Sequence, residues 1–314
     1  MRRQSLLSLS ILIGGCALAQ DVDFAPATRL PPLQTQVNGP EAYYAVATRR
    51  DRIGRIVAPV MINGQGPFHF MLDTGATRTA LALSLTQKLN LPVDSQSRVS
   101  VTGVAGSAAV GTAIVAQLRT GDMLLSNQRL PVLSGLVLDG IDGILGMDGL
   151  DNKRVTADFV HDRLVIVVSP NHRPEFGRSV IPVEFLSDRL LLVTGRVGQI
   201  RTRIVIDTGG THTLGNKALY DALIHGNAIQ GWEFATSVTD VIEASQVGTI
   251  RHTPLLRLGN SMINNVNVTF GDFHVFKAWN LTAEPAMLVG MDVLGTLAEL
   301  TIDYRRKELE ILPL

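Results

Sequence analysis

The nine residues Met71–Thr79, with the sequence Met-Leu-Asp-Thr-Gly-Ala-Thr-Arg-Thr, decide the fold of this chain. In this stretch a short apolar run ends on a single carboxylate, Asp73, which enters a Thr-Gly turn. The pattern returns 134 residues later in Ile204–Thr213, which reads Ile-Val-Ile-Asp-Thr-Gly-Gly-Thr-His-Thr and places Asp207 where Asp73 stood. Two copies of a motif this long, with matched flanks, indicate an internal repeat.

The repeat continues beyond the two turns. Ile144–Leu150 reads Ile-Leu-Gly-Met-Asp-Gly-Leu, and Leu288–Leu294 reads Leu-Val-Gly-Met-Asp-Val-Leu. Each copy then closes with a similar strand-like segment, at 155–166 and at 300–311. One supersecondary plan is therefore used twice, and most of the chain belongs to it.

An Asp-Thr-Gly turn followed by an apolar-apolar-Gly element resembles the lobe of an aspartic protease. The Leu-Gly-Met-Asp sequence is more similar to retropepsin-type domains, including their bacterial relatives, than to pepsin. This resemblance implies an all-β protein of two similar acid-protease-like β-barrel lobes, packed as a pseudo-dimer with a cleft between them. Because both lobes lie in one chain, it also implies a monomer.

Composition agrees with this class. A chain of 314 residues can form one or two domains with a full core. Short apolar segments bounded by Gly, Asn and Pro are typical of an all-β chain. The 28 basic residues balance the 28 acidic ones, so no basic field is present to bind nucleic acid.

The N-terminus predicts an exported protein. Residues 1–19 have the form of a signal peptide, with two arginines, a short apolar stretch and then small residues. Two processing sites compete: Ala17-Leu18-Ala19 fits ordinary cleavage before Gln20, whereas Ile-Gly-Gly before Cys16 resembles a bacterial lipobox. The second site would attach lipid to Cys16 and anchor the protein to a membrane. We expect a periplasmic or cell-envelope location in either case.

The remaining chain divides into four parts. Residues 20–40 are rich in proline and are expected to form a flexible tether. An N-terminal lobe is expected over 41–168, a linker over 169–178 and a C-terminal lobe over 179–314. Helical spacing is expected within 80–89 and 216–225, and a turn within 63–67.

In retropepsin-like lobes the interval after the first helix holds the flap, a hairpin that closes over substrate. Here residues 98–110 alternate around Gly103-Val104-Ala105-Gly106, and glycine permits the sharp turn and close backbone approach that a flap needs. An ordinary hairpin tip has the same sequence features. The interval contains no aromatic residue, unlike pepsin-type flaps. Residues 236–248 lack a Gly-x-x-Gly tip, so we expect one mobile flap, on the first lobe.

Two facing aspartates predict a specific chemistry. Carboxyl groups within hydrogen-bond reach cannot both ionise cheaply, so they share one proton. The ionised member then takes a proton from water while the protonated member donates to the scissile carbonyl. The resemblance assigns catalysis to Asp73 and Asp207. It assigns support of this dyad to Thr74, Gly75, Thr208, Gly209, Leu145, Gly146, Val289 and Gly290.

Other chemistries lack their motifs. The histidines show no metal-ligand spacing, and neither a Gly-x-Ser-x-Gly elbow nor a phosphate loop occurs. The acidic residues near the second motif, Asp139, Asp142, Asp148 and Asp151, do not follow a calcium-loop pattern and are interpreted as turn and capping residues. We therefore expect no metal and no cofactor.

The sequence thus predicts an aspartic endopeptidase that acts on extended polypeptide in the cell envelope. One alternative is an envelope protein that binds peptides in the same cleft without cutting them. Another is a protease for one membrane-associated substrate that is silent on generic proteins.

Overall fold

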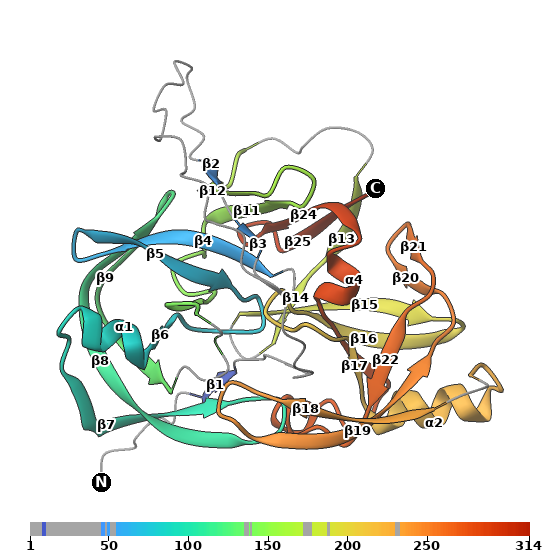
Figure 1. Ribbon diagram of the computed structural model, residues 1–314. Helices are drawn as coiled ribbons and strands as arrows, with labels where there is room; N and C mark the ends of the chain where they lie inside the picture. The colour runs from blue at the N-terminus through green and yellow to red at the C-terminus, as the bar shows by residue number, and fades with distance from the viewer. Residues whose placement is uncertain are drawn as a thin grey trace, which may run out of the picture.

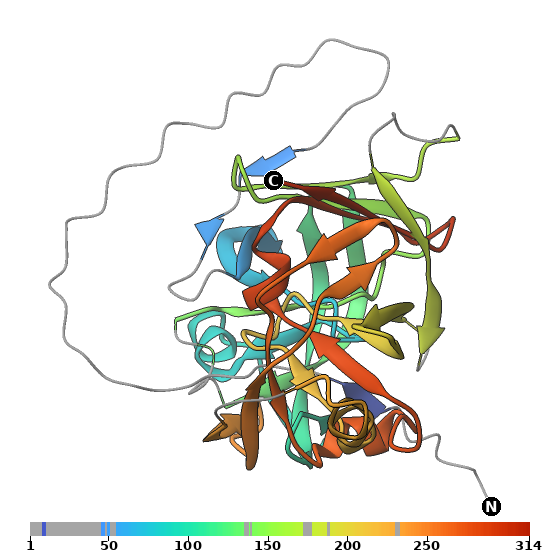
Figure 2. The same cartoon turned by 90° about the vertical axis from the view of Figure 1, so that its right-hand side faces the viewer.

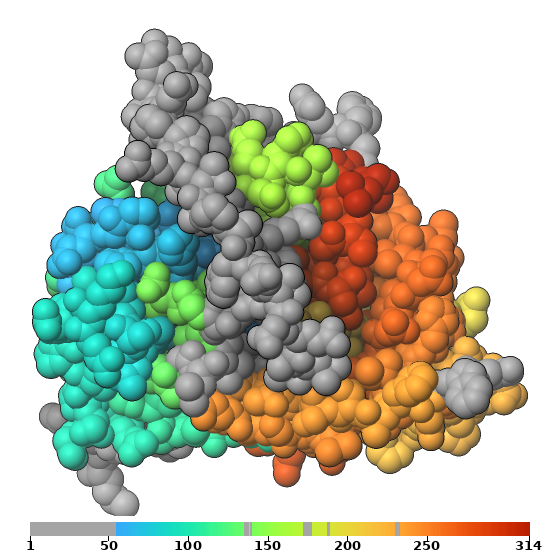
Figure 3. Space-filling model, in the orientation of Figure 1, coloured from blue at the N-terminus to red at the C-terminus, as the bar shows by residue number. Residues whose placement is uncertain are grey.

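The computed structural model describes residues 8–10, 45–47, 49–50, 55–134, 138, 140–171, 178–186, 189–229 and 233–314. These residues form two lobes of β-structure and one sheet that both lobes share (Figures 1 and 2). In the space-filling view the first lobe is blue to green and the second is orange to red (Figure 3). The expected tether, Cys16 and all of the expected signal peptide except Ser8–Ser10 lie outside the described residues.

The first lobe is a nine-stranded sheet. In spatial order it contains β1 (Ser8–Ser10), β7 (Val93–Thr102), β8 (Ser107–Thr120), β9 (Met123–Leu133), β6 (Ala80–Ala82), β10 (Gly143–Leu145), β5 (Gln65–Leu72), β4 (Ile56–Ile62) and β3 (Arg49–Arg50). The sheet closes on itself because β4 pairs with β8 as well as with its neighbours in this order. The turn between β4 and β5 is shorter than the expected 63–67. Only Asn63 and Gly64 connect the strands, both at positive φ, as a two-residue hairpin turn requires.

The segment predicted to be helical at 80–89 divides into two elements. Its first three residues form β6, which pairs with β9 and β10, and only Leu83–Lys88 forms helix α1. β6 is fully buried between two strands, where its backbone groups need sheet partners. Tertiary pairing therefore overrides the local helical spacing.

The second lobe is a ten-stranded sheet with the same plan. It contains β18 (Phe234–Thr239), β19 (Ser245–His252), β22 (Asn267–Phe270), β17 (Leu214–Gly215), β23 (Ala286–Val289), β16 (Ile200–Ile206), β15 (Leu190–Val197), β20 (Leu256–Leu258) and β21 (Ser261–Ile263), with β14 (Glu184–Leu186) beside β15. Its helices are α2 (Lys217–His225), α3 (His274–Ala278) and α4 (Met291–Leu294). Asn216 caps α2 by accepting a hydrogen bond from the Leu219 N–H at 2.8 Å, as its sequence favours.

A six-stranded sheet joins the lobes. Its order is β13 (Ser179–Pro182), β25 (Glu308–Pro313), β24 (Leu297–Asp303), β11 (Lys153–Asp158), β12 (Arg163–Val168) and β2 (Ala45–Ala47). Three strands come from each half of the chain, in mirrored order. At the centre Thr156 lies opposite its repeat equivalent Thr301, with their hydroxyls 2.9 Å apart. The pseudo-twofold axis therefore passes through this pair.

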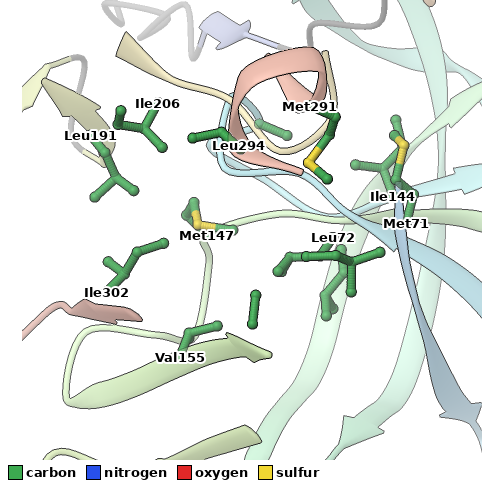
Figure 4. Close-up of a cluster of buried hydrophobic side chains, with 14 of the residues drawn as sticks. Met71, Leu72, Ile144, Met147, Val155, Leu191, Ile206, Met291, Leu294 and Ile302 are labelled. Carbon is green, nitrogen blue, oxygen red and sulfur yellow. The ribbon is translucent and has the colours of Figure 1, made fainter. Parts of the chain in front are cut away.

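Apolar and charged contacts both cross between the lobes. Figure 4 shows Met147 from the first lobe among Leu191, Ile206 and Leu294 of the second, in one continuous buried cluster. In the shared sheet Arg154 binds Glu310 through two hydrogen bonds of 2.7 Å, and both side chains are buried. These contacts fix how the two Asp-Thr-Gly turns face each other.

Candidate active site

Each aspartate lies at the end of a buried strand. β5 ends at Leu72 and β16 ends at Ile206, and each runs parallel to a short strand from the second motif, β10 or β23. The Asp73 N–H donates to Leu145 O at 3.0 Å, and the Asp207 N–H donates to Val289 O at the same distance. The backbone carrying each carboxylate is therefore anchored identically in the two lobes.

A second set of contacts fixes the loop after each turn. Thr79 donates to Asp148 from its N–H at 2.7 Å and from its hydroxyl at 2.6 Å. Thr213 donates to Asp292 in the same way, at 2.9 and 2.7 Å. Each Thr hydroxyl also accepts from the glycine N–H of the second motif at 3.2 Å. Asp148 and Asp292 thus each fix the loop after a turn, which is more specific than the turn and capping role that the sequence predicted for Asp148.

Gly146 and Gly290 permit two backbone segments to cross. A Cβ on Gly146 would lie 2.3 Å from the carbonyl carbon of Arg78, and one on Gly290 would lie 2.8 Å from that of His212. Both obstacles are backbone atoms, which cannot move aside without breaking the turn. The glycines therefore allow β10 and β23 to pass directly beneath the loops.

The two turns are linked by four hydrogen bonds. Thr74 donates its hydroxyl to Ile206 O at 2.7 Å, and Thr208 donates its hydroxyl to Leu72 O at 2.8 Å. Each hydroxyl also accepts from the N–H of the other threonine, at 3.0 and 3.1 Å. Both threonines are fully buried. This reciprocal network holds the lobes in register at the aspartates.

The carboxylates lie against the opposite turn. A Cβ on Gly75 would be 2.7 Å from Asp207 Oδ1, and one on Gly209 would be 2.3 Å from Asp73 Cγ. Only glycine lets the turns approach this closely. The Gly75 N–H donates to Asp73 Oδ1 at 2.8 Å, and the Gly209 N–H donates to Asp207 Oδ1 at 2.9 Å. The Oδ2 atoms of both aspartates are buried and have no hydrogen-bond partner among the described residues.

The two carboxyl groups differ in their titration. Burial raises the pKa of Asp73 well above its usual value, and the nearby charge of Asp207 raises it further. Burial also raises the pKa of Asp207, to about 7, although its hydrogen bond with Asp73 and the N–H groups of Gly209 and Gly210 hold it down. The two groups share one proton and titrate as a pair, and the additional N–H donor at Gly210 favours the charged form of Asp207.

The residue after each turn explains part of this difference. In the first lobe the Ala76 N–H donates to the main-chain oxygen of Asp73 at 3.2 Å. In the second lobe the Gly210 N–H serves the Asp207 side chain instead. Inspection of side chains alone missed this donor because it belongs to the backbone. A glycine directly after an Asp-Thr-Gly turn is the signal that could have revealed it.

The expected flap residues Gly103, Val104, Ala105 and Gly106 form the tip between β7 and β8. This tip contacts the hairpin β18–β19 of the second lobe, where the Ala105 N–H donates to Asp240 Oδ2 at 2.9 Å. That the flap on the first lobe is mobile stays a prediction. Lacking a Gly-x-x-Gly motif, the second hairpin gave no flap signal. The signal that could have been used is Asp240, which is the first residue of the second tip, as Gly103 is the first residue of the first tip.

Within the described residues, no group of three or more His, Cys, Asp or Glu side chains could hold a metal ion. A search of that same part of the chain also found no helix long and apolar enough to span a bilayer.

Comparisons with known proteins agree with this geometry. The sequence profile described as aspartyl protease matches residues 58–148, which include Asp73 and the first five residues of the second motif, 144–148. The solved aspartic proteinase from Irpex lacteus superposes with a TM-score of 0.52 at 16% identity, over 87% of this chain and 97% of that one. No curated protein sequence matches the chain.

Proposed function

We propose, from the premise that this chain has the pepsin/retropepsin-type aspartic protease fold and that its first lobe matches the aspartyl protease family, that it is an endopeptidase with Asp73 and Asp207 as its catalytic dyad. One observation carries the proposal. Two repeat-related turns bring two buried carboxyl groups together, and the Oδ2 atom of each has no hydrogen-bond partner among the described residues. Those oxygens are where a water molecule and a peptide carbonyl would be bound.

The asymmetry of the dyad assigns the roles. Asp207, whose charged form is favoured by the N–H groups of Gly209 and Gly210, acts as the base that takes a proton from water. Asp73, which holds the shared proton, donates it to the carbonyl oxygen as the water attacks. The proton gained by Asp207 then moves to the departing amine. Thr74 and Thr208 contribute by keeping the two groups at fixed separation.

We place its substrate among extended polypeptides of the cell envelope. Support comes from the sequence of residues 1–19, which has the form of an export signal, and from the hairpins β7–β8 and β18–β19, whose backbone can bond an extended chain. Whether Cys16 carries lipid is tested by Cys16→Ala. Movement of the protein from the membrane to the soluble fraction supports the anchor, and a mature N-terminus at Gln20 rules it out.

Cleavage of an unfolded protein and of a peptide library by the purified mature chain tests the function. Asp73→Asn and Asp207→Asn are each expected to lower kcat/KM by at least about a thousandfold, and the double variant no further, because the dyad acts as a unit. Asp221→Asn, which removes an exposed carboxylate paired with Lys217, is the matched control and should retain full activity.

A transition-state mimic of the pepstatin class separates hydrolysis from mere capture of peptides. An enzyme is inhibited by it and releases two products from each substrate. If the wild-type chain binds peptides that stay intact, and Asp73→Asn binds them equally well, the non-catalytic alternative holds and the proposal fails.

A further inference from the structure

The tips of two hairpins from opposite lobes meet. The first hairpin, β7–β8, turns at residues 103–106, and the second hairpin, β18–β19, turns at residues 240–244. They lie against each other at the lower edge of Figure 1, where the green-blue strands meet the orange ones. Each tip is closed by an equivalent hydrogen bond, from Gly103 N–H to Gly106 O at 2.8 Å and from Asp240 N–H to Ala244 O at 2.9 Å.

Asp240 connects the two tips through its two oxygens. Oδ1 accepts from the N–H groups of Ile242 and Ala244, each at 3.1 Å, and so shapes its own turn. Oδ2 accepts from the Ala105 N–H at 2.9 Å, and the Gly106 N–H also bonds this carboxylate. One buried side chain therefore satisfies backbone donors of both lobes.

The fit of the first tip is close. A Cβ on Gly103 would lie 2.1 Å from Asp240 Oδ2, so the carboxylate packs directly on the glycine. The next side chain, Val104, is 1% exposed and packs in an apolar cluster of the second lobe that includes Phe273 and Phe276. The Val104 carbonyl also accepts from the N–H of Val275 at 3.2 Å. The second lobe thus provides a fitted binding surface for the tip of the first hairpin.

We propose that Asp240 is a positioning residue that holds the tip of the first hairpin closed on the second lobe, so that polypeptide reaches the dyad only when this contact opens. The flap latch, as we call it, consists of the Asp240 carboxylate and the N–H groups of Ala105 and Gly106. The inference rests on the proposed function and adds to it the step that admits substrate.

The energetics suit a contact that opens and recloses. Burial raises the pKa of Asp240, and the N–H donors of both tips counter that rise. A hydrogen bond to a charged group contributes more than one between neutral groups, yet far less than a whole protein's stability. Asp73 and Asp207 are both fully buried in this closed arrangement. Substrate cannot reach two buried carboxyl groups without an opening, and in this proposal the contact between the two tips is what opens.

Amide hydrogen exchange on the mature chain tests the latch without relying on activity. In Asp240→Ala the amides of Ala105 and Gly106 are expected to exchange about ten- to a hundredfold faster, the effect of losing a bond to a charged acceptor. Glu243→Gln is the matched control: it removes one negative charge from the same tip and retains an acceptor for the hydroxyl of Ser134. Unchanged exchange in Asp240→Ala, or an equal gain in Glu243→Gln, overturns the proposal.

An engineered disulfide tests whether opening admits substrate. A Cβ on Gly106 would lie 3.5 Å from the Cβ of Ala244, a distance that a disulfide spans. We expect the oxidised double variant Gly106→Cys/Ala244→Cys, made with Cys16→Ala, to lose cleavage of polypeptide and to regain it on reduction. Wild-type cleavage by the oxidised form contradicts the gate.

Kinetics separate positioning from loss of structure. Asp240→Ala removes the contact that must open, so it is expected to raise kcat/KM for polypeptide several-fold with the pH profile of the dyad unmoved, while Asp240→Asn, which keeps an acceptor, stays closer to the wild-type value. A fall in kcat matched by a fall in global stability counts against positioning. If neither the wild type nor the reduced disulfide variant cleaves any substrate, the proposed function fails, and hydrogen exchange alone decides on the latch.

Discussion

The two lobes are nearly identical in the contacts that hold the Asp-Thr-Gly turns, and they differ in the tips of the hairpins β7–β8 and β18–β19. The bonds of Thr74 and Thr208 agree within about 0.1 Å, and Asp148 and Asp292 each bind the N–H and hydroxyl of one threonine. The hairpin tips, by contrast, share neither length nor sequence, and one of them carries an aspartate. Symmetry is therefore kept where two carboxyl groups must face each other. It is abandoned where the two hairpins must make one asymmetric contact.

The largest expected effect comes from the glycines at the backbone crossings. Gly146→Ala places a Cβ 2.3 Å from a backbone carbon, and Gly290→Ala places one at 2.8 Å. We expect both to destabilise the chain, Gly146→Ala by more than about 3 kcal/mol and Gly290→Ala by less. Urea unfolding measures the difference. Gly106→Ala, whose Cβ would lie 3.5 Å from its neighbour, is the control, and equal losses in all three would show that the crossings are not tight.

Next in size is the threonine network, where the lobes should respond equally. Thr74→Val and Thr208→Val each remove a hydroxyl that donates once and accepts once, leaving a buried N–H and a buried C=O unpaired. We expect each to lower the free energy of unfolding by about 2–4 kcal/mol, at roughly 1–2 kcal/mol for each of the two unpaired groups. Thr→Ser at either position keeps the hydroxyl and should cost much less. Unequal losses in the two Val variants would break the symmetry inferred from the distances.

A smaller effect concerns stability against pH. Since the folded pKa of Asp207 is raised to about 7, its ionisation opposes folding, and the stability it allows at pH 4 is lost as the pH rises toward 7. Asp207→Asn cannot ionise. At pH 8 its free energy of unfolding should therefore exceed that of the wild type by about 1–3 kcal/mol, and this difference should disappear near pH 4.

Urea melts over this pH range measure the gap, with Asp221→Asn as an exposed control that should show none. A variant that is less stable than wild type at pH 8 would mean that the charged dyad stabilises the fold.

The smallest expected effect tests the residue after the turn. Ala76→Ser adds a hydroxyl beside Asp73, which has fewer donors than Asp207. A donor favours the charged form, so the pH–rate profile should move in the acid direction, by roughly half a unit. Gly210→Ser offers the contrast, because its Cβ would lie 2.7 Å from Asp207 Oδ2 and should disturb the dyad itself. An Ala76→Ser profile that stays in place or moves to higher pH contradicts this role of the donor.

Much of the fold follows from the sequence because the repeat is explicit. The motifs around Asp73 and Asp207 and around Gly146 and Gly290 specify strand, turn and crossing in each lobe, and the structure has that all-β, two-lobed plan. Segment 80–89 did not follow its local spacing, because pairing with β9 and β10 decides the state of β6. Local patterns carry no information about such partners.

For the site, too, the sequence predicted the residues that belong to the repeat and not the ones that differ between the lobes. The positions of the two aspartates and of their threonines follow from the motifs, since repeat-related residues meet at a pseudo-twofold axis. The difference between the aspartates depends on the backbone N–H of Gly210, and the binding surface for the tip of the first hairpin depends on Asp240. Neither belongs to a repeated pattern, so sequence symmetry could not reveal them.

The shared six-stranded sheet has a consequence for how the molecule comes apart. β11 of the first half pairs along its length with β24 of the second, and the buried pair of Arg154 and Glu310 joins β11 to β25, the strand beyond β24. Neither half can melt without depriving the other of a strand partner and of one member of a buried ion pair. The two lobes are therefore one cooperative unit, and a chain cut between them at 169–178 would produce fragments that remain associated rather than two independent domains.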